Sequence, residues 1–232
     1  MKVGIPRAMS FYYYYPFYRA FLETLGAEVV VSKPTTRGTL NRLTDCPTDE
    51  PCISVKLLFP HANELLRRNV DAIFLPILSS GSAAGFFCPK HTGIPFMLKN
   101  ALVLPDDFLL SPRLDYRDPA GEMSSFAETA RNFFGAGKVK AREAYRQAEL
   151  AQRKFVSLTS TNQITAPEAF SILDGKETAF TRKKPYNPYL IKDPQLRIGI
   201  VAHSYTLYDY IGQNLVQRLR EYGTVLTPEM VR

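Results

Sequence analysis

Short apolar runs alternate with segments of helical periodicity along the first half of the chain. The runs 3–5, 27–31 and 70–76 are rich in β-branched and other apolar residues, which is typical of strands in a parallel sheet covered on both faces. Between them, the segments 17–25 and 53–68 repeat apolar residues at the spacing of one helix face. This alternation of strand and helix predicts an α/β domain with a parallel sheet.

Proline and glycine residues set the expected ends of these elements. Pro16 suits the first turn of a helix, where its missing N–H is not needed, so the tyrosine-rich stretch 10–15 before it is expected to form a loop. Gly26 is a natural helix C-cap. Pro60 should kink the second helix or divide it into two pieces. Further along, the pattern predicts a loop over 79–85, a short helix near 95–100 and a strand near 108–110.

The pattern changes after residue 118. Apolar residues at helical spacing, flanked by many charges, predict two amphipathic helices, one around Phe126 and one around Tyr145, packed against each other rather than lying on a membrane. The proline-rich stretch 183–188, together with Pro194, predicts an ordered linker. After it, Arg197-Ile198-Gly199-Ile200 repeats the pattern of Lys2-Val3-Gly4-Ile5, and a tyrosine-rich loop, an amphipathic segment, a glycine and a short strand follow, as in the first copy.

Three parts are therefore expected: an N-terminal α/β domain over 1–115, a helical segment and linker over 116–190, and the start of a second, incomplete α/β domain over 191–232. A single β-α-β unit cannot bury a full core, because a sheet needs further strands and covering helices. Either this half-domain packs on the first domain, or the natural chain continues beyond Arg232, or a partner completes it. We favour a truncated chain or a partner that supplies the second α/β half, from a subunit of the same family or from a homodimer.

Composition narrows the class of protein. The chain has 232 residues, of which 45% are hydrophobic and 22% charged, as in folded globular domains. No stretch approaches the roughly 18 apolar residues of a membrane span, and the N-terminus is too short and too strand-like for a secretory signal. A cytoplasmic protein is the expectation.

The net charge of +7 comes from 29 basic and 22 acidic residues. Such a balance can favour nucleic acid or phosphate-bearing ligands. Here the two signs are interleaved and not clustered, which favours a solvated basic surface. A nucleic-acid or nucleotide-binding module rests on this charge alone and ranks last among the functional hypotheses.

The three cysteines are the main candidates for chemistry. An odd number does not describe a disulfide framework. Cys52 begins the helix after the second strand's connection and Cys88 follows the third strand, so both are expected at the sheet edge where ligands of α/β proteins bind. A helix N-terminus also favours the thiolate. Their spacing matches neither a ferredoxin run nor a zinc knuckle, and inert cysteines remain the alternative. Cys46 lies in a polar loop where a cysteine can simply be tolerated.

Other polar residues near the cysteines allow two interpretations. Lys56 and Lys90 can offset the charge of a thiolate-bound group or contact a phosphate, or they are ordinary surface lysines. His61, His91 and His203 can be ligands or proton donors, or hydrogen-bonded structural residues. The chain carries no phosphate loop, Ser/His/Asp set or dinucleotide-binding glycine fingerprint.

Several motifs of the chain resemble one family. They are the opening KVGIPRAM with FYYYYPF (2–9 and 11–17), DEPCISVK (49–56), DAIFLP (71–76), CPK with GIP (88–90 and 93–95), and IGI with HSY and LYD (198–200, 203–205 and 207–209). Together they resemble an uncharacterised domain associated with CoA-enzyme activases, a relative of the 2-hydroxyacyl-CoA dehydratase subunits. The opening and the Cys88-Pro89-Lys90 segment are the most specific parts.

The resemblance implies a 4Fe–4S-type iron–sulfur cluster held between two flavodoxin-like domains. Cys52 and Cys88 match the family's N-terminal cluster cysteines; Cys46 can add a third thiolate, although the resemblance does not require one. The ligand set in this chain is incomplete. The chain departs from the pattern at Ser54, where a proline is expected, and at Pro60, where a glycine is usual.

The resemblance also implies a role and partners. Dehydratase relatives receive one electron from an ATP-hydrolysing, actin-like activase and act on a 2-hydroxyacyl-CoA. For this chain we expect an iron–sulfur component of low-potential electron transfer or reduction, with an acyl-CoA as a candidate substrate and no turnover by the chain alone. The alternative is a non-catalytic scaffold or docking domain for the activase-type ATPase.

Overall fold

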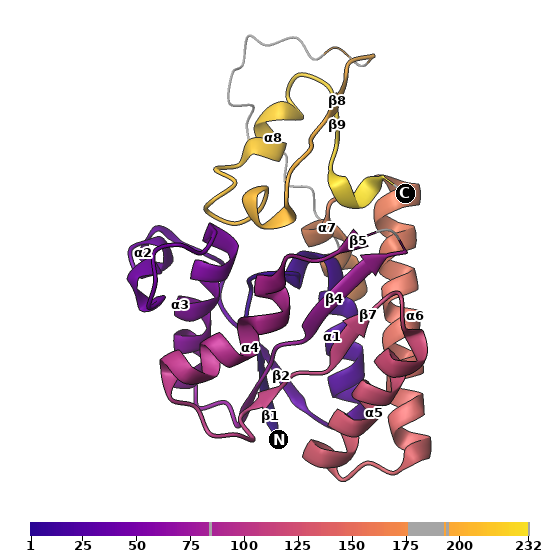
Figure 1. Cartoon of the computed structure of the whole chain (residues 1–232). Helices are drawn as coiled ribbons and strands as arrows, with labels where there is room; N and C mark the ends of the chain where they lie inside the picture. The colour runs from indigo at the N-terminus through magenta and orange to yellow at the C-terminus, as the bar shows by residue number, and fades with distance from the viewer. Residues whose placement is uncertain (84, 176–192, 194, 232) are drawn as a thin grey trace.

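Four parallel strands form the central sheet of the N-terminal part (Figure 1). They are β1 (Lys2–Ile5), β2 (Glu28–Val31), β3 (Ala72–Phe74) and β6 (Leu109–Leu110), in the order β2-β1-β3-β6. The computed structural model describes residues 1–83, 85–175, 193 and 195–231. Parallel strands in this order, connected through helices, define a flavodoxin-like α/β arrangement, as the sequence pattern predicts.

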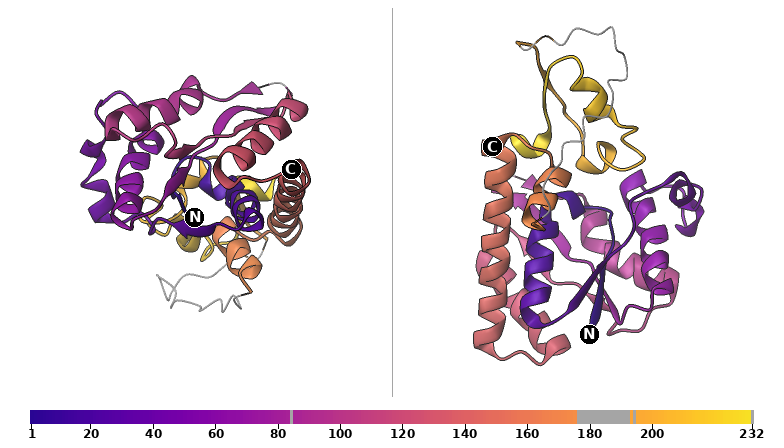
Figure 2. Two further views of the ribbon diagram at one scale, coloured as in Figure 1. Left: turned by 90° about the horizontal axis from the view of Figure 1, so that it is seen from below. Right: turned by 180° about the vertical axis from the view of Figure 1, so that it is seen from behind.

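Helices cover both faces of this sheet, as the view along it shows (Figure 2). Val3, Ile5 and Phe74 point to one face and share a core with α1 (Phe11–Leu25) and the helices that follow residue 118. Ile73 and Leu75 point to the other face, against α3 (Ile53–Arg67) and α4 (Pro89–Leu102). Successive side chains of a strand point to opposite faces, and both faces are covered by helices. The strands are therefore apolar at consecutive positions and not only at alternate ones.

Gly4 of β1 permits the close approach of α3. A Cβ built at this position would lie 3.0 Å from Leu65 Cδ1. Leu65 is fully buried, so a larger residue in β1 would push this helix away from the sheet. The glycine in the motif shared by the two halves therefore has a packing reason here.

A second small sheet corrects the expectation for residues 79–85, which are not a plain loop. β4 (Ile77–Ser82) pairs in parallel with β7 (Arg113–Asp115) and antiparallel with β5 (Gly85–Phe86). The buried Ser80 hydroxyl donates to the Asp115 carboxylate across the strand pair. The pairing of β4 with β7 joins residues about 35 positions apart, so local sequence gives no signal for it.

Three helices extend through prolines, and each corrects an expectation from the sequence. α1 begins at Phe11 and contains Pro16, so the tyrosine-rich stretch 11–15 is helical rather than a loop. α3 is continuous and is not divided at Pro60. α4 is longer than expected and contains Pro95. All three prolines are buried, and the packing around them outweighs the hydrogen bond that each ring removes.

The helices after residue 118 confirm the predicted amphipathic pair. α5 (Pro119–Phe134) and α6 (Lys138–Asn162) contact each other through the Phe126 and Tyr145 rings, whose centroids are 5.6 Å apart. Both also pack on α1, so the pair covers one face of the sheet. A further helix, α7 (Ala166–Leu173), was not predicted. The predicted linker, 183–188 with Pro194, lies outside the described residues.

The C-terminal segment has the predicted strand-helix-strand order. β8 (Arg197–Gly199) and β9 (Thr224–Leu226) pair in parallel, with the short α8 (Leu215–Leu219) between them. The remaining short elements are α2 (Arg37–Leu40) and the 3-10 helices Leu43–Asp45, Ser204–Thr206 and Pro228–Met230. Within the described ranges, no helix is both long enough and apolar enough to cross a bilayer.

Candidate functional site

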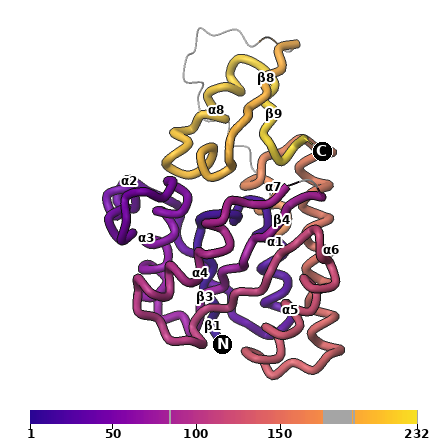
Figure 3. Tube along the Cα trace, in the orientation of Figure 1, coloured from indigo at the N-terminus to yellow at the C-terminus, as the bar shows by residue number. Residues whose placement is uncertain are grey.

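The carboxyl edge of the central sheet gathers the candidate residues. Cys52 is the N-cap residue of α3, and Cys88 is the N-cap residue of α4. Each cysteine thus lies immediately before the first residue of its helix. The two helices are neighbours, since Leu58 of one and Leu98 of the other share a buried cluster. The C-terminal segment lies over this edge (Figure 3).

Both N-cap thiols are accessible. Cys52 and Cys88 are exposed, neither is in a disulfide, and neither makes a side-chain cap hydrogen bond. The third cysteine differs, because Cys46 is only 6% exposed and packs within the buried cluster around α3 and α4. The structure thus separates two accessible thiols at helix starts from one buried thiol.

Residues of the C-terminal segment face the same edge. Burial, followed by the charges of Cys52 and Tyr13, raises the pKa of Tyr205. The His203 ring stacks on Tyr205 with centroids 5.3 Å apart. Burial and then the charge of His203 lower the pKa of His91, which lies in the first turn of α4. Tyr205 and His203 therefore form the wall opposite the starts of α3 and α4.

Asp209 holds this wall in place. Its carboxylate pairs with Arg7 at 3.7 Å and accepts a hydrogen bond from the Thr35 backbone N–H at 3.2 Å. The adjacent Tyr210 N–H donates to the Thr35 carbonyl at 3.1 Å. The Tyr208 ring packs on Tyr12 with centroids 4.9 Å apart. These contacts bind the loop after β8 to the loops that follow β1 and β2.

Replacing Asp209 by alanine is expected to loosen the C-terminal segment without unfolding the rest. Loss of the pair with Arg7 and of the bond from Thr35 should cost about 1–3 kcal/mol of local stability, which raises the opening equilibrium about 5-fold to 150-fold. Hydrogen exchange should speed up at Thr35 and Tyr210 and stay unchanged in α5. The Asp107→Ala variant, at an exposed carboxylate, serves as the matched control. Unchanged exchange at both amides in Asp209→Ala would show that the contact is not a restraint.

His61 has the structural role rather than that of a ligand. It is 2% exposed, its Nδ1 lies 3.0 Å from Ser32 Oγ, and its Nε2 lies 2.9 Å from Thr35 Oγ1. Burial and then the charge of Arg7 lower the pKa of His61 to about 4. Both ring nitrogens are engaged beneath the loops of the site, so this histidine supports their conformation.

The two candidate lysines differ in their surroundings. Lys56, one turn into α3, pairs with Asp49 at 3.3 Å. Lys90, in the first turn of α4, is half-buried, and no ion pair of it is seen among the residues that the structure describes. Lys90 is thus the more available cation beside an exposed thiol.

The thiols do not form a complete metal cage by themselves. In the described part of the chain, no group of three or more His, Cys, Asp or Glu side chains is placed to hold a metal ion. Two accessible thiols at helix N-termini suit the start of a cluster site, because cluster irons take cysteine thiolates. The donor set offered here fits part of such a group.

Sequence reasoning missed Asp209, Arg7 and Tyr205 as parts of this site. Asp209 and Tyr205 stand in the motifs LYD and HSY, so the tyrosine-rich loop after the second IGI motif was an available signal. Their pairing with the loops of the first half is a tertiary contact. It could not be inferred from spacing.

These features define a flavodoxin-like α/β protein with two accessible thiols at the carboxyl edge of its sheet and a C-terminal segment closed over them. The family model of the CoA enzyme activase uncharacterised domain matches residues 2–231. The chain therefore belongs to that family. Comparisons with curated proteins and with solved structures find no match.

Proposed function

We propose that this protein is an iron–sulfur-cluster-binding component related to the 2-hydroxyacyl-CoA dehydratases, acting in ATP-activated, low-potential electron transfer or reduction. Cys52 and Cys88 supply two thiolate ligands of a 4Fe–4S-type cluster. The observation that carries the proposal is the placement of both exposed thiols as N-cap residues of two neighbouring helices. Membership of the activase-associated family supports it.

The physical chemistry of a helix start favours this role. The first backbone N–H groups of a helix and its dipole stabilise negative charge, so they favour the thiolate that binds iron. The same N–H groups can donate to cluster sulfur, which tunes the reduction potential. Lys90 adds a positive charge within two residues of Cys88, and Lys56 is one turn from Cys52; either can offset the charge of the site or meet a CoA phosphate.

The remaining ligands come from outside the pair. A second α/β half, from a subunit of the same family or from a homodimer, would face the first across the edge that carries the thiols. Cys46 is the third thiol of the proposal. Because it is buried, its use requires the loop between α2 and α3 to open.

The partner in electron transfer is an actin-like ATPase activase, and the substrate class is an acyl-CoA. An activase that hydrolyses ATP would pass one electron to the cluster site. Accessible thiols suit a reducing compartment such as the cytoplasm. The chain's own residues contribute binding of the cluster, its electrostatic surroundings and the closed wall of Tyr205 and His203.

Anaerobic reconstitution with iron and sulfide tests the proposal. The protein, together with any subunit that purifies with it, should turn brown and bind iron and sulfide. Cys52→Ala and Cys88→Ala should each lose most of the iron and the visible absorbance. A colourless, iron-free product from the unsubstituted protein would refute the role.

Cys46→Ala is the matched control in that experiment. A buried thiol outside the ligand set should leave the iron content unchanged, whereas loss of iron would place Cys46 in the set. All three variants should be compared by thermal unfolding, so that loss of iron is not confused with loss of fold.

The second candidate is a non-catalytic docking domain for the activase-type ATPase. The observation that favours it is the incomplete donor set among the described residues. In that case Cys52→Ala would bind the ATPase as well as the unsubstituted protein does, and reconstitution would give no iron. Coupled loss of iron and of ATPase-driven reduction would instead support the cluster role.

A further inference from the structure

A separate cavity opens at the carboxyl ends of β4 and β7. Its volume is about 390 Å³, which lies within the range of small-molecule sites. α6 forms one wall, α1 and the start of α5 form others, and none of the three cysteines lines it. Its lining includes Tyr14, Phe17, Asp115, Glu122, Tyr145, Glu149, Gln152 and Arg153.

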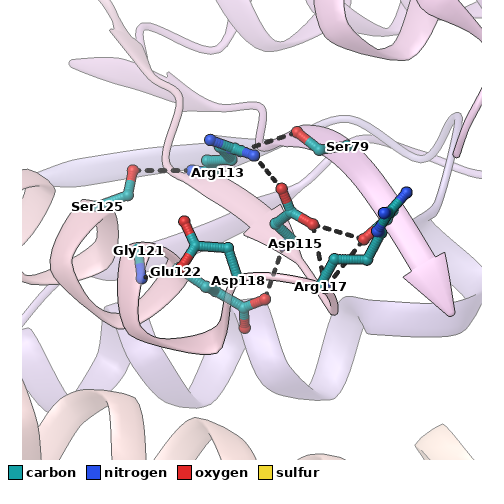
Figure 4. A network of polar contacts seen from close by, with 9 residues as sticks. Ser79, Arg113, Asp115, Arg117, Asp118, Gly121, Glu122 and Ser125 are labelled. Atoms are coloured by element: carbon teal, nitrogen blue, oxygen red, sulfur yellow. Dashed lines mark hydrogen bonds and ion pairs between the residues drawn. The ribbon is translucent and has the colours of Figure 1, made fainter. Parts of the chain in front are cut away.

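The charge of one carboxylate in the cavity, that of Asp115, is compensated by its neighbours. Asp115 pairs with Arg113, and its Oδ1 accepts from Ser80 Oγ and, at 3.1 Å, from the Arg117 backbone N–H (Figure 4). Its side chain is almost fully buried within this network. Asp115 therefore shapes the floor of the cavity and does not offer free charge.

A second carboxylate, Glu122, has no cationic partner among the described residues. Glu122 Oε2 accepts from the Asp115 backbone N–H at 2.7 Å, and its Oε1 accepts from the Tyr145 hydroxyl at 2.6 Å. Neither donor is cationic, and among the described residues no arginine or lysine pairs with Glu122. Glu149 and Arg153 both line the cavity, and Arg153 approaches the Glu149 carboxylate only to 3.9 Å, so Glu122 and Glu149 outnumber the one lining arginine. The cavity thus has an excess of negative charge in a protein whose net charge is +7.

Aromatic rings surround these carboxylates. Phe17 and Tyr145 meet edge to face with centroids 5.6 Å apart, and Tyr14 lies on the same side of α1. Burial and Glu122 raise the pKa values of Tyr14 and Tyr145, so both phenols stay neutral. Aromatic faces combined with carboxylates recognise organic cations through the ring quadrupole and charge-assisted hydrogen bonds.

The amide of Gln152 supplies a buried acceptor to the cavity. Its Nε2 donates to the Tyr13 carbonyl at 2.8 Å, which fixes the orientation of the amide. The Oε1 atom is buried, and no hydrogen-bond partner of it is found in the part of the chain that the structure describes. A buried acceptor of this kind favours a ligand that carries N–H donors.

We propose that this cavity binds a small organic cation, with a guanidinium or primary ammonium group on a short aliphatic chain. The cationic group lies between Glu122 and Glu149 and donates toward the Gln152 amide. The aliphatic part packs on the Phe17 and Tyr145 rings. The site is independent of the cysteines, so its binding does not depend on any cluster.

Calorimetric titration of the full chain with butylguanidinium tests the proposal, with neutral pentanamide and anionic pentanoate as probes of similar size. Butylguanidinium should bind with a favourable enthalpy, and the amide and the carboxylate should bind about tenfold or more weakly. Equal binding of pentanamide, or no measurable binding of butylguanidinium at millimolar concentrations, would overturn it.

Substitutions locate the site. Glu149→Gln lies on a partly exposed helix surface and should fold normally, yet it should weaken butylguanidinium binding about tenfold. Glu122→Gln should weaken it at least as much. Glu128→Gln, an exposed carboxylate on α5, removes the same charge outside the cavity and should bind like the unsubstituted protein. Equal affinities in all three variants would refute the assignment.

Discussion

Replacing Phe126 by alanine is expected to lower the free energy of unfolding by about 3–5 kcal/mol. Phe126 is fully buried, and its ring contacts Phe17, Phe21, Phe74 and Tyr145 with centroids between 5.0 and 6.4 Å away. These rings join α1, β3, α5 and α6, so the cavity would open where sheet and helices meet. Urea or thermal unfolding measures the loss.

Two further variants make this prediction sharp. Phe126→Leu fills most of the space and should cost clearly less than alanine, which keeps the comparison possible if Phe126→Ala does not fold. Phe96→Ala removes a ring from α4 that is 65% exposed and should change stability by about 0.5 kcal/mol or less. Similar costs for Phe96→Ala and Phe126→Ala would contradict the central place given to the aromatic cluster.

The stability of the protein is expected to fall on mild acidification because of His61. Its folded-state pKa is lowered to about 4, against about 6.5 in an unfolded chain. Above pH 6.5 both states hold the neutral ring and no penalty exists. Below pH 6.5, His61 is protonated in the unfolded chain but stays neutral in the folded protein until the pH nears 4. The free energy of unfolding therefore falls by about 2 kcal/mol by pH 5 and by about 3 kcal/mol below pH 4.

The His61→Gln variant isolates this contribution. Glutamine can keep one hydrogen bond to Ser32 or Thr35 but cannot titrate. The variant should be less stable at pH 7, and its stability should fall less steeply than that of the unsubstituted protein between pH 6.5 and pH 4. Carboxylates that titrate in this range are common to both proteins and cancel in the difference. Parallel curves would show that His61 does not titrate as its burial implies.

The elements predicted from sequence are those defined by local patterns. The strands β1 and β2 follow from apolar runs, and α5 and α6 follow from the helical spacing of apolar residues. The end of α1 follows from Gly26, which adopts the left-handed conformation of a C-cap with φ of 92°. The start of α1 was predicted wrongly because Pro16 was placed in a first turn, whereas the packing of Phe11 and Tyr12 on α7 and the C-terminal segment extends the helix. β4 was missed because its parallel partner, β7, lies far away in sequence.

In the candidate site, too, features set by local sequence could be predicted, whereas those set by tertiary contacts could not. The helix start at Cys52 could be predicted, because an apolar helical pattern begins immediately after it. The helix after Cys88 was predicted too short, since Pro95 was interpreted as its beginning. Asp209 and Gln152 could not be found, because each acquires its meaning from a backbone group of a distant segment, Thr35 in one case and Tyr13 in the other.

The buried prolines of α1, α3 and α4 have a mechanical consequence. Because Pro16, Pro60 and Pro95 have no N–H, they cannot bond the carbonyls of Tyr12, Lys56 and His91, each in the first or second turn of its helix. The first turns are thus joined to the rest of their helices by fewer bonds and bend more easily at that point. The first turns that carry Cys52 and Cys88 can tilt while the buried parts of α3 and α4 stay packed in their shared cluster. The two thiols can therefore change their separation without unpacking either helix.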